Sequence, residues 1–170
     1  MSKRKNPERE DTNQTIYIDS CFVDAYLWGD KDTRRYAKRI FYKIKKIISS
    51  NPNIKAIIPF VSLGEIVNTL IQKGKKDKNE KMFKLIEDLE ADTPPPNKTV
   101  IKIAFDILKK DKWFDPTDAI IAAHALCDKY STRLFTTDIN MQTSKVLSEL
   151  EEDLRKTEER KRELKISDRF

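Results

Sequence analysis

Near its N-terminus the chain reads TIYID at residues 15–19, a run of β-branched and aromatic side chains that is typical of a short buried strand. We expect this strand to end at Asp19. Two further runs have the same character, at residues 55–60 and 133–136. Segments between the strands have helical spacing, so the chain predicts an α/β fold with a parallel sheet covered by helices on both faces.

Apolar residues recur every three or four positions in the segments around these strands. The predicted helices cover residues 22–28, 33–49, 62–74, 79–90, 98–110 and 116–129. From about residue 141 the pattern predicts a long charged C-terminal helix. The chain is therefore divided into a polar leader (1–14), an α/β domain (15–145) and a charged helical extension (146–170).

Composition limits the kind of protein that this chain can be. Its 170 residues, 38% hydrophobic and 36% charged, suit one domain that folds without disulfides or zinc. No run of 18 apolar residues predicts a membrane span, and the first ten residues lack the apolar stretch of a signal peptide. We therefore expect a cytoplasmic protein with no membrane partner.

Cysteine and histidine are too scarce to supply the chemistry of an enzyme. Cys21 and Cys127 match no zinc spacing, and we expect both to be small buried hydrophobic residues. The one histidine, His124, shares a predicted helix face with apolar residues and is expected to pack there. Catalysis in this chain would therefore depend on carboxylates.

Four acids fall at one edge of the predicted sheet, where the carboxyl ends of parallel strands meet the N-termini of crossover helices. Asp19 ends the first strand, and Glu65 lies in the opening turn of the helix after the second. Asp118 opens the helix before the third strand, and Asp138 directly follows that strand. Two carboxylates about 4 Å apart repel by roughly 4 kcal/mol at an effective dielectric near 20. Such a cluster needs a shared proton or a divalent cation, and all-oxygen ligands favour Mg²⁺ or Mn²⁺.

Each acid also has a purely structural interpretation. Glu65 lies three residues after a serine, the spacing of a capping box in which its carboxylate would bond a backbone amide. Asp115 precedes a proline and is a good N-cap, and Asp118 has the spacing to complete a similar box. Asp138 is compatible with a simple turn. The joint placement of the acids at one edge favours a shared site.

The segments around these acids resemble the motifs of PIN domains, in order and approximate spacing, over about residues 15–145. They read IDS at 18–20, SLGEI at 62–66, DAIIAAHAL at 118–126 and FTTD at 135–138. The third segment is the most specific, because it is similar to the family's D-A-x-I-A-A-x-A-L pattern. The last is similar to the family's T-x-D pattern.

The resemblance implies a PIN-like three-layer fold, an endoribonuclease that depends on Mg²⁺ or Mn²⁺, and single-stranded or structured RNA as its substrate. The residues it assigns as catalytic and metal-binding acids are Asp19, Glu65, Asp118 and Asp138, with the neighbouring hydroxyls of Ser20 and Thr136. Many family members have a further Asp where this chain has Asn140, whose amide adds no charge. Asp115 is a candidate to compensate, although a helix cap is the simpler role.

The positive charge of the chain, +6 overall, is concentrated in two segments. Residues 31–46 hold eight basic residues against one acid, and residues 73–84 hold six against two. Such segments are suited to binding the phosphate backbone of a polyanion, although a solvated lysine-rich surface explains them equally well. The side chains that we expect to contact RNA are Arg35, Lys38, Arg39, Lys75 and Lys76.

Two further expectations concern partners and alternative functions. Many small PIN proteins are the toxins of toxin–antitoxin pairs and dimerise, so the resemblance implies a homodimer and an antitoxin protein as candidate partners. The alternative function is a PIN-like RNA-binding or assembly module with weak or no catalysis, and Asn140 gives it some support. A haloacid-dehalogenase-like phosphatase is disfavoured because the sequence after Asp19 lacks a D-x-D pattern.

Overall fold

The fold is built on a parallel β-sheet. The computed structural model describes residues 13–74 and 76–170, so residues 1–12 of the predicted leader lie outside it. Four strands form the sheet in the order β2-β1-β3-β4: β1 (Gln14–Ile18), β2 (Ile54–Ile57), β3 (Ser131–Phe135) and β4 (Lys165–Ser167). Every neighbouring pair is parallel. The three predicted strands are confirmed, and β4 is an addition.

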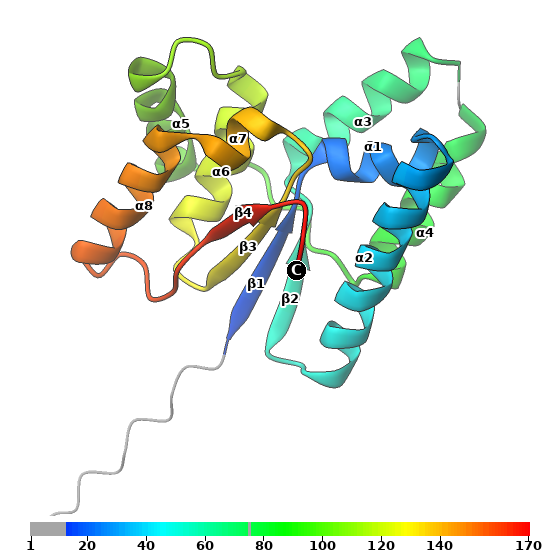
Figure 1. Ribbon diagram of the computed structural model, residues 1–170, viewed down its shortest axis with the longest axis horizontal. Helices are drawn as coiled ribbons and strands as arrows, with labels where there is room; N and C mark the ends of the chain where they lie inside the picture. Colours follow the sequence, from blue (N-terminus) through cyan, green and yellow to red (C-terminus); the bar gives the residue numbers. More distant parts are fainter. Residues whose placement is uncertain (1–12, 75) are drawn as a thin grey trace, which may run out of the picture.

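Helices cover both faces of this sheet. They are α1 (Ser20–Trp28), α2 (Lys31–Ser50), α3 (Phe60–Gln72), the 3₁₀ turn η1 (Lys76–Lys78), α4 (Asn79–Asp88), α5 (Lys98–Lys110), α6 (Pro116–Cys127), α7 (Ile139–Thr143) and α8 (Lys145–Lys156). Figure 1 shows α1, α2, α3 and α4 on one side of the strands and α5, α6, α7 and α8 on the other. Within the described ranges, no helix has the length and apolar character needed to cross a membrane.

Successive residues of the central strands point into two separate cores. Ile16 and Ile18 of β1 pack against α1–α4, whereas Tyr17 between them packs against α5–α8. Leu134 and Phe135 of β3 divide in the same way. A strand buried on both faces reads as a continuous apolar run, which explains why these segments show no polar alternation. The predicted α/β fold with three layers is confirmed.

Short polar residues and one glycine set the ends of several helices. The Asp30 carboxylate accepts bonds from the amides of Asp32 and Thr33, both at 2.9 Å, and thereby caps the long α2. The Asn97 side chain caps α5 in the same way. Gly74, with φ +62°, follows α3, and this left-handed conformation ends the helix where the sequence predicts it.

The predicted long C-terminal helix is wrong beyond Lys156. Helix α8 ends there, and residues 165–167 instead form β4, which pairs with β3 at an otherwise open edge of the sheet. Leu164, just before β4, is buried in the core below α6 and α8. Edge pairing is a long-range contact, so the local charge pattern of the tail could not reveal it. The division of the chain at residue 145 stays a prediction.

Arg160 fastens this tail to the rest of the domain. Its side chain is only 3% exposed, and Nη1 donates to the carbonyls of Ala125 and Leu126 at 2.7 and 2.8 Å. Nη2 donates to the carbonyl of Ser131, at the start of β3, at 2.8 Å. The guanidinium thus satisfies carbonyls that the C-terminus of α6 leaves without helical partners. It also places positive charge at the negative end of that helix.

We predict that Arg160→Ala destabilises the protein by about 2–4 kcal/mol, because several buried carbonyls lose a charged donor at once. Urea unfolding followed by circular dichroism measures this loss. Lys156→Ala is the matched control, since its pair with Glu152 is exposed on both sides and such pairs contribute about 0.5 kcal/mol or less. Equal stability of the two variants would contradict the anchoring role.

Candidate active site

The candidate site lies where β1 and β3 end. Their arrowheads meet near the middle of Figure 1, where α1, α3 and α7 approach one another. Asp19 connects β1 to α1, and its amide donates to the carbonyl of Phe135 at 2.9 Å. This bond extends the pairing of β1 with β3 by one residue. The first predicted acid is therefore held by backbone bonds on the sheet itself.

Asp19 is 1% exposed, and three neighbouring polar groups contact its carboxylate. Thr136 Oγ1 donates to Oδ2 at 2.7 Å, and Cys21 Sγ lies 2.8 Å from the same oxygen. Ser20 Oγ approaches Oδ1 at 3.2 Å. A buried carboxylate is tolerated only when such donors replace its water. The expected neighbours Ser20 and Thr136 thus do contact an acid of the predicted set.

Ser20 and Thr136 also connect Asp19 to two other acids. Ser20 Oγ lies 2.6 Å from Glu65 Oε2 and farther from Asp19, so its single hydrogen is donated to Glu65. Thr136 Oγ1 accepts from the amide of Asp138 at 3.0 Å. One network of side chains therefore joins residues from β1, α3 and the loop after β3.

The capping-box interpretation of Glu65 is wrong. Helix α3 begins at Phe60, two residues earlier than predicted, so Ser62 lies inside the helix and Glu65 in its second turn. The Ser62 hydroxyl is buried and has no hydrogen-bond partner among the described residues. Burial raises the pKa of Glu65, which the nearby Asp19 and Asp115 raise further, while bonds from Ser20 and Thr117 lower it.

Asp118 occupies the first turn of α6, as predicted. Asp115 is the N-cap of that helix and accepts from the amide of Thr117 at 2.8 Å, which confirms its expected capping role. Burial raises the pKa of Asp118 to about 8, and the charges of the other acids contribute in the order Asp19, Asp138, Asp115 and Glu65. The four predicted acids therefore share one electrostatic environment.

Asp138 acts at once as a member of this group and as a turn residue. Its Oδ1 accepts from the amide of Asn140 at 2.7 Å and caps the short α7. A pocket of about 160 Å³ is lined by Trp113, Phe114, Asp115, Asp118, Asp138 and Asn140. Two predicted acids and Asn140 thus line an opening through which a ligand can reach the site.

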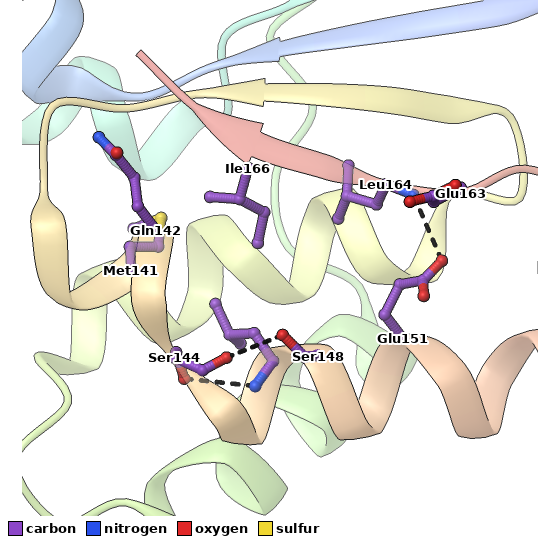
Figure 2. Close-up of a pocket in the computed structure, with 9 residues that line it drawn as sticks. Met141, Gln142, Ser144, Ser148, Glu151, Glu163, Leu164 and Ile166 are labelled. Atoms are coloured by element: carbon purple, nitrogen blue, oxygen red, sulfur yellow. Dashed lines mark hydrogen bonds between the residues drawn. The ribbon is translucent and has the colours of Figure 1, made fainter. Parts of the chain in front are cut away.

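Another pocket, of about 220 Å³, lies between α7, α8 and β4 and contains none of the four acids (Figure 2). Met141, Leu164 and Ile166 form its apolar walls, and Glu151 accepts from the amide of Leu164 at 3.3 Å. These contacts hold the tail against α8. We therefore place the candidate chemistry at the acids and not in this pocket.

Two polar residues of the site were missed or misinterpreted from the sequence. Cys21 is half-buried as a hydrogen-bonding thiol beside Asp19, not as an inert apolar residue, and burial together with Asp19 raises its pKa to about 12. Asp24 lies one turn after Ser20 on α1, and burial raises its pKa to about 7. The spacing of four residues from Ser20 was the available signal, because it puts both on one helix face.

The chemistry of this group of ligands fits a hard divalent cation. All four predicted acids offer oxygen, and an added positive charge would counter both the burial and the neighbouring acids that raise the pKa of Asp118. Within the part of the chain that the structure describes, however, no three acids, cysteines or histidines lie close enough to form a ready-made metal cage.

The predicted RNA-binding residues fall outside this acidic cluster. Arg35, Lys38 and Arg39 are exposed on α2. Lys75 lies outside the described residues, and so does the side chain of Lys76.

Comparison with known proteins adds one finding. A family model described as PIN domain matches residues 16–147, a segment that runs from β1 to the beginning of α8 and contains all four acids. A search of curated proteins gives no match.

We predict that Asp118→Asn stabilises the metal-free protein at pH 7–8. The folded pKa of about 8 exceeds the unfolded value of about 3.9, so wild type loses stability as pH rises between these values. Solvent screening at this partly exposed carboxylate limits the gain to about 1–2 kcal/mol, or a few degrees in Tm. Thermal unfolding in EDTA at pH 4 and pH 8 measures it.

Asp106→Asn is the control for this prediction, because Asp106 lies on α5 and pairs with Lys109 in solvent. It should not raise Tm at either pH. If Asp118→Asn does not raise Tm at pH 8 any more than Asp106→Asn does, the unfavourable ionisation of Asp118 in the folded protein is refuted.

Proposed function

The chain belongs to the PIN-domain family, a family of predicted nucleases, and on this basis we propose that it is an Mg²⁺- or Mn²⁺-dependent endoribonuclease that hydrolyses RNA phosphodiester bonds. The proposed catalytic and metal-binding residues are Asp19, Glu65, Asp118 and Asp138. The observation that carries the proposal is the hydrogen-bond network through Ser20 and Thr136 that joins Asp19, Glu65 and Asp138. Asp118 lies near enough to this network that, with burial as the larger cause, the neighbouring acids raise its pKa to about 8. Carboxylates that are held close together despite their mutual repulsion are typical of sites that bind cations or transfer protons.

The residues of the site divide into a fixed part and an accessible part. Asp19 is buried, and the bonds from Thr136 and Ser20 restrict its carboxylate to one orientation. Asp118 and Asp138 line the pocket, where a phosphodiester can approach. The fixed acid would hold an ion in place, and the accessible acids would contact both the ion and the water around it.

A divalent ion in such a site supplies Lewis-acid polarisation of the phosphate and lowers the pKa of a bound water. The chain's own contribution is orientation. Ser20 holds Glu65, and Thr136 contacts both Asp19 and the backbone of Asp138, so the acids move little when substrate arrives. Preorganised charge of this kind is effective in catalysis because it needs no rearrangement during the reaction.

Substrate affinity would come from the basic residues. An acidic pocket repels RNA phosphates, so the polyanion needs attraction elsewhere on the surface. Arg35, Lys38 and Arg39 are exposed along α2, and we assign them to contacts with the RNA backbone. The homodimer, the antitoxin partner and the cytoplasmic location stay predictions.

One observation favours the alternative of a PIN-like RNA-binding or assembly module. Asn140 lines the pocket beside Asp118 and Asp138, at the position where many family members have an acid. A neutral amide weakens the attraction for a cation, and a weak site would bind RNA without efficient turnover. Metal titration and cleavage assays separate the two functions.

We predict that Asp19→Asn and Asp118→Asn each lower Mg²⁺- or Mn²⁺-dependent RNA cleavage by about 100-fold or more, because each removes a charged ligand from the ion. Cleavage of a labelled RNA on denaturing gels measures the rate, and calorimetric titration with Mn²⁺ measures binding. Far-UV circular dichroism should show that both variants fold.

Asp106→Asn again serves as the control and should cleave like wild type. Full activity in both site variants would eliminate the nuclease proposal. Saturable Mn²⁺ binding by wild type, without cleavage of any RNA tested, would favour the binding module.

We further predict that changing Arg35, Lys38 and Arg39 together to Gln weakens RNA binding and reduces its salt dependence. Each lost phosphate contact on single-stranded RNA lowers the magnitude of the slope of log K against log salt by about 0.7. The slope of the triple variant should therefore be smaller in magnitude by about 2. Fluorescence anisotropy over a series of salt concentrations measures the slope. The control changes Lys102, Arg155 and Lys156 to Gln, since these residues are exposed on α5 and α8. An equal decrease of the slope in this control would refute the assignment of RNA binding to α2.

A further inference from the structure

We infer that Trp113 is a stacking platform that contacts an unpaired base of the RNA beside the proposed site. The inference rests on the proposed function, since it adds a base contact beside the place where the phosphodiester would be cut. Trp113 lies in the loop between α5 and α6 and lines the same pocket as Asp118 and Asp138.

The exposure of Trp113 is the first part of the evidence. Its side chain is 96% exposed, although burying an indole would stabilise the fold by roughly 2–3 kcal/mol. The next residue, Phe114, is buried in the core with α5 and α6. The loop therefore turns one aromatic side chain inward for packing and leaves its neighbour in solvent, at the edge of the candidate site.

The loop also holds Trp113 in a defined position. Its amide donates to Asp111 Oδ1 at 3.0 Å, and the amide of Phe114 donates to the carbonyl of Asp111 at 3.3 Å. Directly after Phe114, Asp115 caps α6. Because the backbone on both sides is fixed, binding a ligand there needs only the indole side chain to be ordered, not the loop.

The chemistry of the pocket indicates which part of a nucleic acid the indole would contact. Asp115, Asp118 and Asp138 are acids, so phosphates near them depend on a cation, whereas a neutral base has no such restriction. An aromatic face stacks on any base and contributes about 1–3 kcal/mol per base. Bases of a duplex are already stacked on one another, so this contact selects unpaired bases.

A protein partner is the competing occupant, because exposed tryptophans are also common at protein interfaces. An apolar pocket suited to such a partner does lie on α5 and α6, lined by residues that include Phe105, Pro116 and Ile120. Trp113 is not among its lining residues and instead lines the pocket of Asp118 and Asp138. An aromatic residue that shares a pocket with acids fits a base better than it fits a hydrophobic surface.

The test compares Trp113→Ala and Trp113→Phe in an Asp19→Asn background, which keeps the RNA intact. The probes are a fluorescein-labelled single-stranded RNA of mixed sequence, an abasic ribose-phosphate strand of equal length, and a duplex. We expect Trp113→Ala to raise the Kd for the single strand about 5- to 100-fold. The Kd of Trp113→Phe should stay within about threefold of that of the Asp19→Asn protein. Neither variant should change Kd for the abasic strand or the duplex by more than about twofold.

Phe83→Ala is the matched control, because Phe83 is an exposed aromatic residue on α4, on the other side of the sheet, and its loss should not change binding. Quenching of tryptophan fluorescence by single-stranded RNA should disappear in Trp113→Phe, which retains only Trp28. In the cleavage-competent protein, Trp113→Ala should raise KM and leave kcat within about twofold.

Equal losses for the abasic and the base-bearing strand would overturn the inference, and so would a change of oligomeric state in Trp113→Ala that accounts for the lost binding. The two proposals fail separately. If wild type binds single strands through Trp113 but cuts no RNA, the nuclease proposal falls and the stacking site stands. If wild type cuts RNA and Trp113→Ala has unchanged Kd and KM, only the stacking site falls.

Discussion

Repulsion between carboxylates at the ends of β1 and β3 is the constraint on which this structure depends. The parallel sheet brings Asp19 and Asp138 to one edge, and the helices that return to this edge add Glu65 and Asp118. Burial raises the pKa of Asp118, and the neighbouring acids raise it further, so ionising this carboxylate in the folded protein is unfavourable. The arrangement therefore costs stability, and under the proposed function a bound divalent cation would offset that cost.

Asp19 is the centre of the arrangement because it is the acid most deeply embedded in the fold. Its backbone extends the pairing of β1 with β3, and its carboxylate receives bonds from Thr136 and Ser20, which in turn contact Asp138 and Glu65. The site is therefore rigid at its base and open at the pocket, where Asp118 and Asn140 meet solvent. Rigidity at the base fixes the orientation of Asp19, and openness at the pocket leaves Asp118 and Asn140 accessible.

The far end of α6 shows how the rest of the domain supports this edge. Asp115 caps its N-terminus and Arg160 binds the carbonyls at its C-terminus, so the helix that carries Asp118 is fixed at both ends. Strand β4 covers the edge of β3 and brings the chain's last residues into the sheet. The tail is thus part of the support for the sheet, although its composition is that of a surface helix.

The sequence by itself determined the alternation of three strands with helices and the caps at Asp115 and Gly74, because each depends on neighbouring residues. It also indicated the four acids as candidates. Only the tertiary structure decided that Ser20 rather than a helix amide binds Glu65, that Cys21 and Asp24 join the acidic site, and that the tail forms β4 held by Arg160. The physical reason is separation along the chain. Propensity, periodicity and capping are local, whereas a hydrogen bond between Thr136 and Asp19 or between Arg160 and Ala125 exists only after folding has brought distant segments together.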